Sequence, residues 1–382
     1  MAALLEVEHL VKHFVAGRSL FGRPTAHVKA VDGVSFHVDA GETLALVGES
    51  GCGKSTVSRL VLRLIEPDAG RIRFDGRNLL ALDADALWAF RRQAQLIFQD
   101  PYASLNPRMT VSQILGEPLA LHDLVPAEGR RARIEDLLRL VGLEPRFARR
   151  YPHEFSGGQR QRIAIARALA VEPKLIICDE PVSALDVSIR SQILNLLRDL
   201  QDRLGLAYIF VSHDLAVVKH IADRVAVMNL GGIVETADTQ TLFASPRHPY
   251  SRALLSAIPV PKPRATRRRM LLQGEMPSAL NPPRAAASTR AARMRSTAAA
   301  RKCRICSAMR QDMQPLATAS PSCRRPKASL PPTAASRRHW RNWWRRSAGD
   351  GKDRHRPGLV RLVHHRRLAV DTAGWRLNGR RF

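Results

Sequence analysis

The chain has 382 residues, of which 45% are hydrophobic, and its formal net charge is +27. This length allows a large hydrophobic core and more than one domain. The charge is unevenly distributed, because residues 261–382 contain 30 Lys and Arg against 5 Asp and Glu, whereas residues 1–260 contain 31 against 29. The nearly neutral first part excludes a chain-wide basic surface, and the basic charge describes only the C-terminal segment.

The sequence predicts a protein that stays in the cytosol. The stretch MAALLEVEHLVKHF has Glu6 and Glu8 where a signal peptide would have basic residues and then an apolar segment. No apolar run approaches the roughly 18 residues that a membrane-spanning helix needs. The five cysteines offer no disulfide framework, as expected in a reducing compartment.

Short apolar runs alternate with amphipathic helical segments over residues 4–258. The runs TLALVG (43–48), LIICDE (175–180) and LAYIFVSH (206–213) have strand length and end in small or polar residues. A helix is predicted over 187–204, with Gly205 as its C-cap. This alternation predicts an α/β fold in which a mainly parallel sheet is covered on both faces.

Two parts of the chain depart from this alternation. Residues from about 103 to 165 combine a proline-containing loop with helical patterns and predict a helical subdomain inserted into the α/β core. From Pro259 onward Pro, Arg and Ala dominate and the hydrophobic periodicity disappears, as in a linker or a disordered segment. The predicted organisation is a folded domain over 4–258, an extension over 259–283 and a basic low-complexity tail over 284–382.

A glycine-rich segment, GESGCGKST, follows the first of the apolar runs and precedes a helical pattern. It fits the phosphate-binding motif G-x-x-x-x-G-K-[ST] in the strand–loop–helix context that the motif requires, whereas the alternative is a glycine-rich turn matched by chance. Lys54 is predicted to reach the β- and γ-phosphates of a nucleotide, and the Ser55 hydroxyl is predicted to bind Mg²⁺. The predicted nucleotide-binding residues of this segment are Gly48, Ser50, Gly51, Cys52, Gly53, Lys54, Ser55 and Thr56.

Two adjacent acids, Asp179 and Glu180, end the apolar run LIICDE. One acid at such a strand end can hold Mg²⁺, and a second can orient or deprotonate an attacking water. The alternative is a pair of solvated acids. Because the same chain has the phosphate-binding segment, the sequence favours Asp179 as a metal-binding residue and Glu180 as a catalytic base.

The segment FSGGQ, residues 155–159, stands directly before a helical pattern and resembles the signature motif of ABC-type ATPases. The resemblance continues, because LIFQDP, SALD and VSHD are similar to the Q-loop, D-loop and switch of that family and occur in the family's order. It covers residues 4 to about 283. It implies a P-loop NTPase fold with an antiparallel β subdomain in addition to the parallel core and the helical subdomain.

The resemblance also implies roles for individual residues. Gln99 would be a metal-site residue that senses both Mg²⁺ and the attacking water. His213 would donate a hydrogen bond to the γ-phosphate. Phe14 is a weaker match to the aromatic residue that stacks on adenine, since a Phe on an amphipathic strand is commonly a core residue. In head-to-tail dimers each signature motif would contact the partner's ATP, through Ser156, Gly157, Gly158 and Gln159.

Two longer segments, FQDPYASLNPRMTV and SPRHPYSRALLSAIPVP, look like parts of the ATP-binding subunits of oligopeptide/dipeptide importers. That group also includes importers of nickel and glutathione. The resemblance implies ATP hydrolysis with ATP and Mg²⁺ at the cytoplasmic face of the cell membrane. The implied partners are a second ATPase subunit, either a copy or a paralogue, two transmembrane permease subunits and, indirectly, a substrate-binding protein.

A nucleic-acid function is the alternative, because ABC-type ATPases also act in DNA repair and on ribosomes. Those proteins generally carry two cassettes, zinc modules or coiled-coil arms, and the sequence shows one cassette and none of these additions. Residues 1–260 also lack the charge excess of a phosphate-binding surface. We therefore expect no nucleic-acid partner.

The tail begins where a family pattern stops. In peptide importers a segment like GEMPSALNPP is typically followed by a cysteine-rich segment, but here RAAASTRAARMRSTAAARKC follows. A one-frame slip explains the change, because the permitted codons of the shifted frame place cysteines at the family's spacing. We interpret residues from about 284 to 382 as an out-of-frame translation, a genuine basic extension being the alternative. The nucleotide sequence decides between the two, and we assign the tail no iron–sulfur site.

Overall fold

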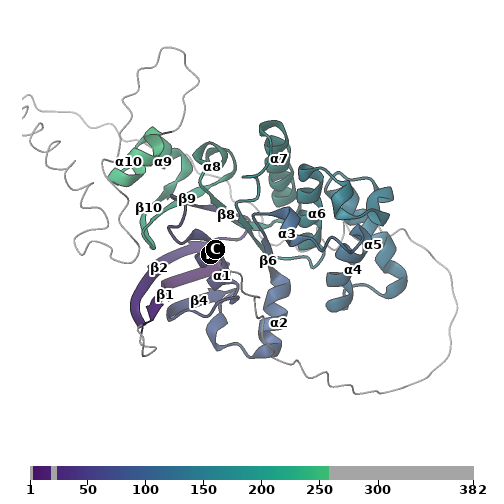
Figure 1. The fold of residues 1–382 in the computed structure, drawn as a ribbon, viewed down its shortest axis with the longest axis horizontal. Helices are drawn as coiled ribbons and strands as arrows, with labels where there is room; N and C mark the ends of the chain where they lie inside the picture. The colour runs from purple at the N-terminus through teal and green to yellow at the C-terminus, as the bar shows by residue number, and fades with distance from the viewer. Residues whose placement is uncertain (1–2, 19–23, 258–382) are drawn as a thin grey trace, which may run out of the picture.

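The computed structural model describes residues 3–18 and 24–257, which form two sheets and the helices around them (Figure 1). The predicted extension over 259–283 and the tail over 284–382 lie outside the described residues. The strands are β1 (Leu5–Arg18), β2 (Pro24–Val38), β3 (Thr43–Val47), β4 (Ala69–Phe74), β5 (Arg77–Asn78), β6 (Ala94–Ile97), β7 (Leu175–Asp179), β8 (Ala207–Ser212), β9 (Arg224–Asn229) and β10 (Gly232–Asp238). The α-helices are α1 (Lys54–Val61), α2 (Ala84–Gln93), α3 (Pro101–Ser104), α4 (Val111–Leu121), α5 (Ala127–Leu140), α6 (Gly157–Leu169), α7 (Val187–Leu204), α8 (Leu215–Ile221), α9 (Thr239–Ala244) and α10 (Pro249–Ser256).

The six-stranded sheet has the order β10-β9-β3-β8-β7-β6, and only its edge strand β10 pairs antiparallel to its neighbour. The three predicted apolar runs are β3, β7 and β8, which lie side by side in its centre. Every residue of these strands is buried. Their side chains alternate between two cores, because Ile177 and Ile209 join one cluster while Ile176 and Tyr208 join the other. The predicted α/β class with a mainly parallel sheet is confirmed.

The four-stranded sheet, β2-β1-β4-β5, is antiparallel and packs with α1 on one face of the larger sheet. Alternate residues of its strands, such as Leu5, Val34 and Ile72, are fully buried and meet Leu60 of α1 in one cluster. β1 and β2 form a long antiparallel hairpin, paired from Leu5 and Val38 as far as Arg18 and Pro24. This sheet is the antiparallel β subdomain that the resemblance implies.

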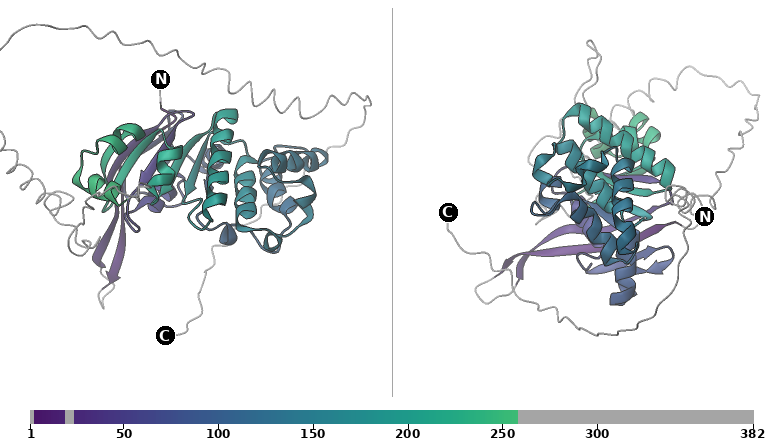
Figure 2. Two further views of the ribbon diagram at one scale, coloured as in Figure 1. Left: turned by 90° about the horizontal axis from the view of Figure 1, so that it is seen from above. Right: turned by 90° about the vertical axis from the view of Figure 1, so that its right-hand side faces the viewer.

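Helices cover the opposite face of the six-stranded sheet. α6 and α7 pack there, and α7 ends at Gly205 in a left-handed conformation, φ 67°, as the sequence predicts. α4 and α5 lie beyond α6 at the end of the molecule that is farthest from the β1–β2 hairpin (Figures 1 and 2). Within the described residues no helix is long and apolar enough to cross a bilayer.

Candidate functional site

The phosphate loop, residues 48–53, joins β3 to α1 and is packed between β2 and the end of β9. A Cβ atom on Gly53, whose φ is +107°, would lie 2.0 Å from the carbonyl oxygen of Ala30 in β2. A Cβ atom on Gly48 would lie 2.3 Å from the carbonyl oxygen of Met228 in β9. Only glycine fits at these two positions, so the backbone of the loop is held against the sheet.

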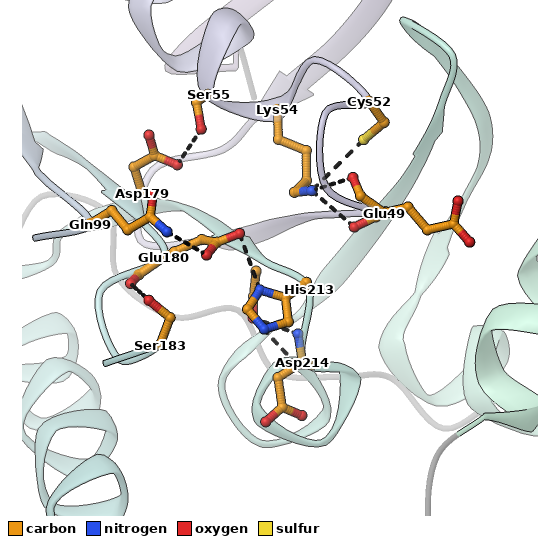
Figure 3. Close-up of polar contacts among 12 residues, drawn as sticks. Glu49, Cys52, Lys54, Ser55, Gln99, Asp179, Glu180, Ser183, His213 and Asp214 are labelled. Carbon is orange, nitrogen blue, oxygen red and sulfur yellow. Dashed lines mark hydrogen bonds and ion pairs between the residues drawn. The ribbon is translucent and has the colours of Figure 1, made fainter. Parts of the chain in front are cut away.

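Lys54 begins α1 and turns its side chain back into the loop (Figure 3). Its ammonium nitrogen, Nζ, donates hydrogen bonds to the carbonyl oxygens of Gly48 and Glu49, each at 2.9 Å, and lies 3.8 Å from the sulfur of Cys52. The side chain is buried, and the two carbonyls compensate the desolvation of its charge. Burial raises the pKa of the Cys52 thiol more than the nearby ammonium lowers it, so this thiol stays protonated.

Ser55 and Asp179 meet where α1 faces the end of β7. The Ser55 hydroxyl donates a hydrogen bond to a carboxylate oxygen of Asp179 over 2.9 Å. Burial raises the pKa of Asp179, the Ser55 hydrogen bond lowers it, and the charge of Glu180 raises it further, so that the net shift is upward. A hydroxyl and a carboxylate at this position are oxygen ligands of the kind that Mg²⁺ prefers.

Glu180 lies directly after β7 and has a left-handed backbone, φ 47°, which is rare for a residue with a side chain. Its backbone N–H donates to the carbonyl oxygen of Val211 in β8 at 3.0 Å, which holds this conformation. One carboxylate oxygen accepts a hydrogen bond from Gln99 Nε2 at 3.0 Å, and the other lies 3.1 Å from His213 Nδ1 (Figure 3). The three predicted catalytic side chains are therefore joined in one polar group.

The positions of these groups follow from the order of the strands. The phosphate loop follows β3, His213 follows β8, Asp179 ends β7 with Glu180 directly after it, and Gln99 follows β6. β3, β8, β7 and β6 are consecutive neighbours in the sheet and run parallel. Because the carboxyl ends of parallel strands meet at one edge, segments that lie far apart in the sequence converge there.

A pocket of about 560 Å³ opens at this edge of the sheet. The predicted residues that line it are Gly48, Ser50, Gly51, Gly53, Lys54, Ser55, Thr56, Gln99, Glu180 and His213. Lys54 is the only Lys or Arg among the lining residues, which all belong to the described part of the chain. The pocket therefore presents one ammonium group and the loop backbone to an anionic ligand.

Phe14 is not among the residues that line the pocket. It is directly opposite Val28 in the pairing of β1 with β2, and Val28 does line the pocket. The Phe14 ring is 38% exposed, and the ammonium of Lys12 lies 5.8 Å from its centre. Phe14 thus lies beside the pocket on the exposed part of the sheet and is not a core residue.

The signature segment begins α6 and is separate from the pocket. Ser156 is the N-cap: its hydroxyl accepts a hydrogen bond from the N–H of Gln159 at 3.4 Å, and its own N–H donates to the Gln159 side chain at 3.1 Å. Ser156 and Gly157 are exposed, whereas Gly158 is buried and a Cβ there would lie 2.4 Å from Ile189 of α7. None of these residues lines the pocket, so within one chain the structure does not bring the signature to the phosphate loop.

Part of the pocket wall was not predicted from the sequence. Val28 and Ala30 of β2 and Leu254 of α10 line it, and the hydroxyl of Tyr250 accepts a hydrogen bond from the N–H of Glu49 in the phosphate loop at 3.2 Å. Leu254 and Tyr250 both lie in the segment SPRHPYSRALLSAIPVP. That segment indicated a family, but it did not predict a contact with the phosphate loop.

Two family models match the chain. The model described as "ABC transporter" matches residues 31–183, and the model described as "Oligopeptide/dipeptide transporter, C-terminal region" matches residues 234–287. The second match ends at residue 287, shortly after residue 284, from about which the tail is predicted to begin.

Several curated relatives are about half identical to the chain. The oligopeptide transport ATP-binding protein AppF of Bacillus subtilis (strain 168) is 52% identical over 284 residues, which are 74% of this chain and 86% of the relative. The corresponding protein OppF of Salmonella typhimurium (strain LT2) is 52% identical over 285 residues, 73% of this chain and 85% of the relative. The dipeptide transport ATP-binding protein DppF of Escherichia coli (strain K12) is 52% identical over 280 residues, 73% of this chain and 84% of the relative.

Solved structures agree with these matches. The dimeric, post-hydrolysis ATP-binding cassette MJ0796 bound to ADP and Pi is 30% identical, with a TM-score of 0.55, and the match covers 62% of this chain and 98% of that one. The cassette CbiO1 of Clostridium perfringens gives the same TM-score and identity over 64% of this chain and 92% of its own. The fold, the nucleotide pocket and the relatives agree: the chain belongs to the ABC transporter family, as an ATP-binding subunit of the oligopeptide/dipeptide type.

Proposed function

We propose that this ATPase powers the import of oligopeptides, dipeptides or a related ligand across the cytoplasmic membrane. The proposal rests on the convergence of Lys54, Ser55 and Glu180 on one pocket at the edge of the parallel sheet, with Asp179 outside the lining but bonded to Ser55. The names of the relatives and the match to the transporter C-terminal region support the ligand class. The same relatives favour transport over the nucleic-acid alternative.

In the proposed reaction Lys54 and the loop N–H groups bind the phosphates of ATP. Glu180 accepts a proton from the water that attacks the γ-phosphorus, and ADP is the leaving group. Gln99 and His213, which both contact the Glu180 carboxylate, hold that carboxylate and the water in place. The left-handed backbone of Glu180 supports this role, since strained residues are concentrated at functional sites.

We also propose a Mg²⁺ ion beside the nucleotide, held by Ser55, Asp179 and Gln99. The donors fit the ion, because a hydroxyl, a carboxylate and an amide oxygen are hard ligands, and the first two already lie 2.9 Å apart. When bound, the ion would neutralise charge on the phosphates. Asp179 must be ionised for this, and its raised pKa makes proton competition stronger than for an exposed carboxylate.

The signature segment, whose Ser156 and Gly157 are exposed, supports a proposal for the partners. Ser156, Gly158 and their neighbours lie outside the chain's own pocket, so a second ATPase subunit arranged head to tail would bring a signature to each nucleotide. We place the pair against two transmembrane permease subunits at the cytoplasmic face of the membrane, as a peripheral component. A substrate-binding protein would deliver the ligand to the permease.

Transport in proteoliposomes tests the proposal. The chain is co-expressed with the permease pair and any sister ATPase encoded beside it, and uptake of labelled dipeptides, oligopeptides, glutathione and nickel is measured with the matching binding protein. We expect ATP-dependent uptake of a peptide. ATP-dependent uptake of none of these ligands, by an assembled complex that hydrolyses ATP, would contradict the proposed ligand class.

Asp179→Asn should give a chain that is more stable but hydrolyses ATP far more slowly. The pKa of Asp179 is higher in the folded chain than in the unfolded chain, so the ionised carboxylate destabilises the fold. This loss of stability grows as the pH rises from the pKa of the unfolded state through the pKa of the folded state. The amide removes that charge but binds Mg²⁺ poorly. We expect a higher melting temperature, with a gap to the natural chain that widens from pH 4 to pH 8, and hydrolysis reduced about 100-fold or more.

Thermal melts across this pH range and phosphate release assays measure the two effects. Asp199→Asn, on the exposed face of α7, is the matched control and should change neither. A lower melting temperature for Asp179→Asn at pH 8 would show that the carboxylate stabilises the fold, against this account.

A further inference from the structure

The start of α10 is fixed to β10 by hydrogen bonds. The two carboxylate oxygens of Glu235 in β10 accept from the N–H groups of Arg247, at 2.7 Å, and His248, at 2.9 Å. His248 is the N-cap of α10, and its Nδ1 accepts from the N–H of Tyr250 at 3.2 Å. The segment HPY, which the catalytic roles leave unused, therefore sets the position of this helix on the sheet.

Tyr250 connects this helix to the phosphate loop. Its side chain is 3% exposed, and its hydroxyl oxygen accepts the N–H of Glu49 at 3.2 Å. Burial raises the pKa of this hydroxyl, so it is neutral throughout the physiological range. A neutral hydroxyl is a suitable acceptor for this half-buried backbone donor.

The hydrogen bond from Glu49 acts on Lys54 through one peptide group. The N–H of Glu49 and the carbonyl of Gly48 belong to the same planar peptide unit, on opposite sides of it. The carbonyl of Gly48 accepts from Lys54 Nζ at 2.9 Å. Tyr250 therefore binds the N–H of this planar peptide group, and the carbonyl of the same group binds the Lys54 ammonium, which faces the nucleotide pocket.

The same helix face also forms part of the pocket wall. Leu254 follows Tyr250 by four residues, one helical turn, and lines the pocket. We propose that Tyr250 is a positioning residue for Lys54 and that α10 completes the nucleotide site, so that ATP affinity depends on the C-terminal part of the folded domain. This inference rests on the proposed function of the pocket.

Tyr250→Phe tests the proposal in the full chain, because it removes the hydroxyl and keeps the ring in its core. We expect the dissociation constant for MgATP to rise roughly 3- to 10-fold, the effect of losing one hydrogen bond, with kcat at saturating ATP and the melting temperature nearly unchanged. Hydrogen exchange of the peptide that contains Glu49 should accelerate. This second readout follows the Glu49 N–H itself and would not respond to a loss of packing elsewhere.

Tyr208→Phe is the matched control, since that tyrosine is also fully buried but its hydroxyl donates to the carbonyl of Leu197, away from the pocket. It should leave ATP affinity and exchange at Glu49 unchanged. Leu254→Ala is the second variant and should weaken MgATP binding while the Glu49 N–H stays protected.

The outcomes separate the inference from the proposed function. Unchanged affinity and exchange in Tyr250→Phe, or equal weakening by Tyr208→Phe, would overturn the positioning role. Unchanged affinity in Leu254→Ala would overturn the role of α10 in the wall. If the natural chain itself does not bind MgATP, the proposed function of the pocket fails, whatever the variants do.

Discussion

The Glu180→Gln chain should bind MgATP with nearly normal affinity and hydrolyse it about 10²- to 10⁴-fold more slowly than the natural chain. Glutamine has the size of glutamate and can still bond to Gln99 and His213, but it cannot take a proton from water. The left-handed backbone is kept, so the fold should not change. Because hydrolysis is slow, two ATP-bound subunits should remain together, and size-exclusion chromatography with ATP should show a dimer.

Phosphate release under single-turnover conditions, together with nucleotide binding, measures this effect. Glu66→Gln is the matched control, since Glu66 is an exposed residue paired with Arg63 and lies outside the pocket. Its turnover should equal that of the natural chain. Near-normal hydrolysis by Glu180→Gln would contradict the assignment of Glu180 as the catalytic base.

Lys54→Met should reduce the affinity for MgATP about 30-fold or more, because truncating one partner of a buried charge pair costs 2–5 kcal/mol or more. Lys54 provides the only Lys or Arg charge in the wall of the described pocket, so no neighbour can replace it. Methionine keeps most of the length of the side chain, and its thioether donates no hydrogen bond. The carbonyls of Gly48 and Glu49 would also lose their ammonium partner, so the loop should become less ordered.

Equilibrium dialysis with labelled nucleotide measures this affinity, and ADP should be affected together with ATP. Lys219→Met, on the exposed side of α8, is the control and should bind both nucleotides normally. An affinity within about threefold of the natural value in Lys54→Met would contradict the assignment of this pocket to the phosphates.

The elements that the sequence predicted well are those whose signal is local. β3, β7 and β8 are continuous apolar runs, and α7 carries its own C-terminal glycine. The phosphate loop is a local motif. Once the strands are parallel neighbours, the meeting of Asp179, Glu180, Gln99 and His213 follows from where each strand ends.

The contacts that the sequence could not predict join segments that are far apart. Glu49 and Tyr250 are 201 residues apart, and nothing in either residue's type predicts a contact with the other. The length of the β1–β2 pairing was also not predicted: AHVKA (26–30) alternates apolar and polar residues, but residues 15–25 show no such alternation. The position of Phe14 beside the pocket follows from pairing with Val28, which depends on that hairpin's register.

The parallel pairing of β3 affects how the protein folds during its synthesis. β3 is synthesised early, as residues 43–47, yet both of its neighbours, β8 and β9, come late in the chain. Thr43 and its partner Tyr208 are 165 residues apart, which at translation rates of 5–20 residues per second corresponds to about 10 to 30 s. During that time β3, every residue of which is buried in the folded domain, has neither of its neighbours in the sheet. A ribosome that stalls before β8 therefore exposes apolar side chains of β3 that the folded domain buries, and such transient exposure favours aggregation.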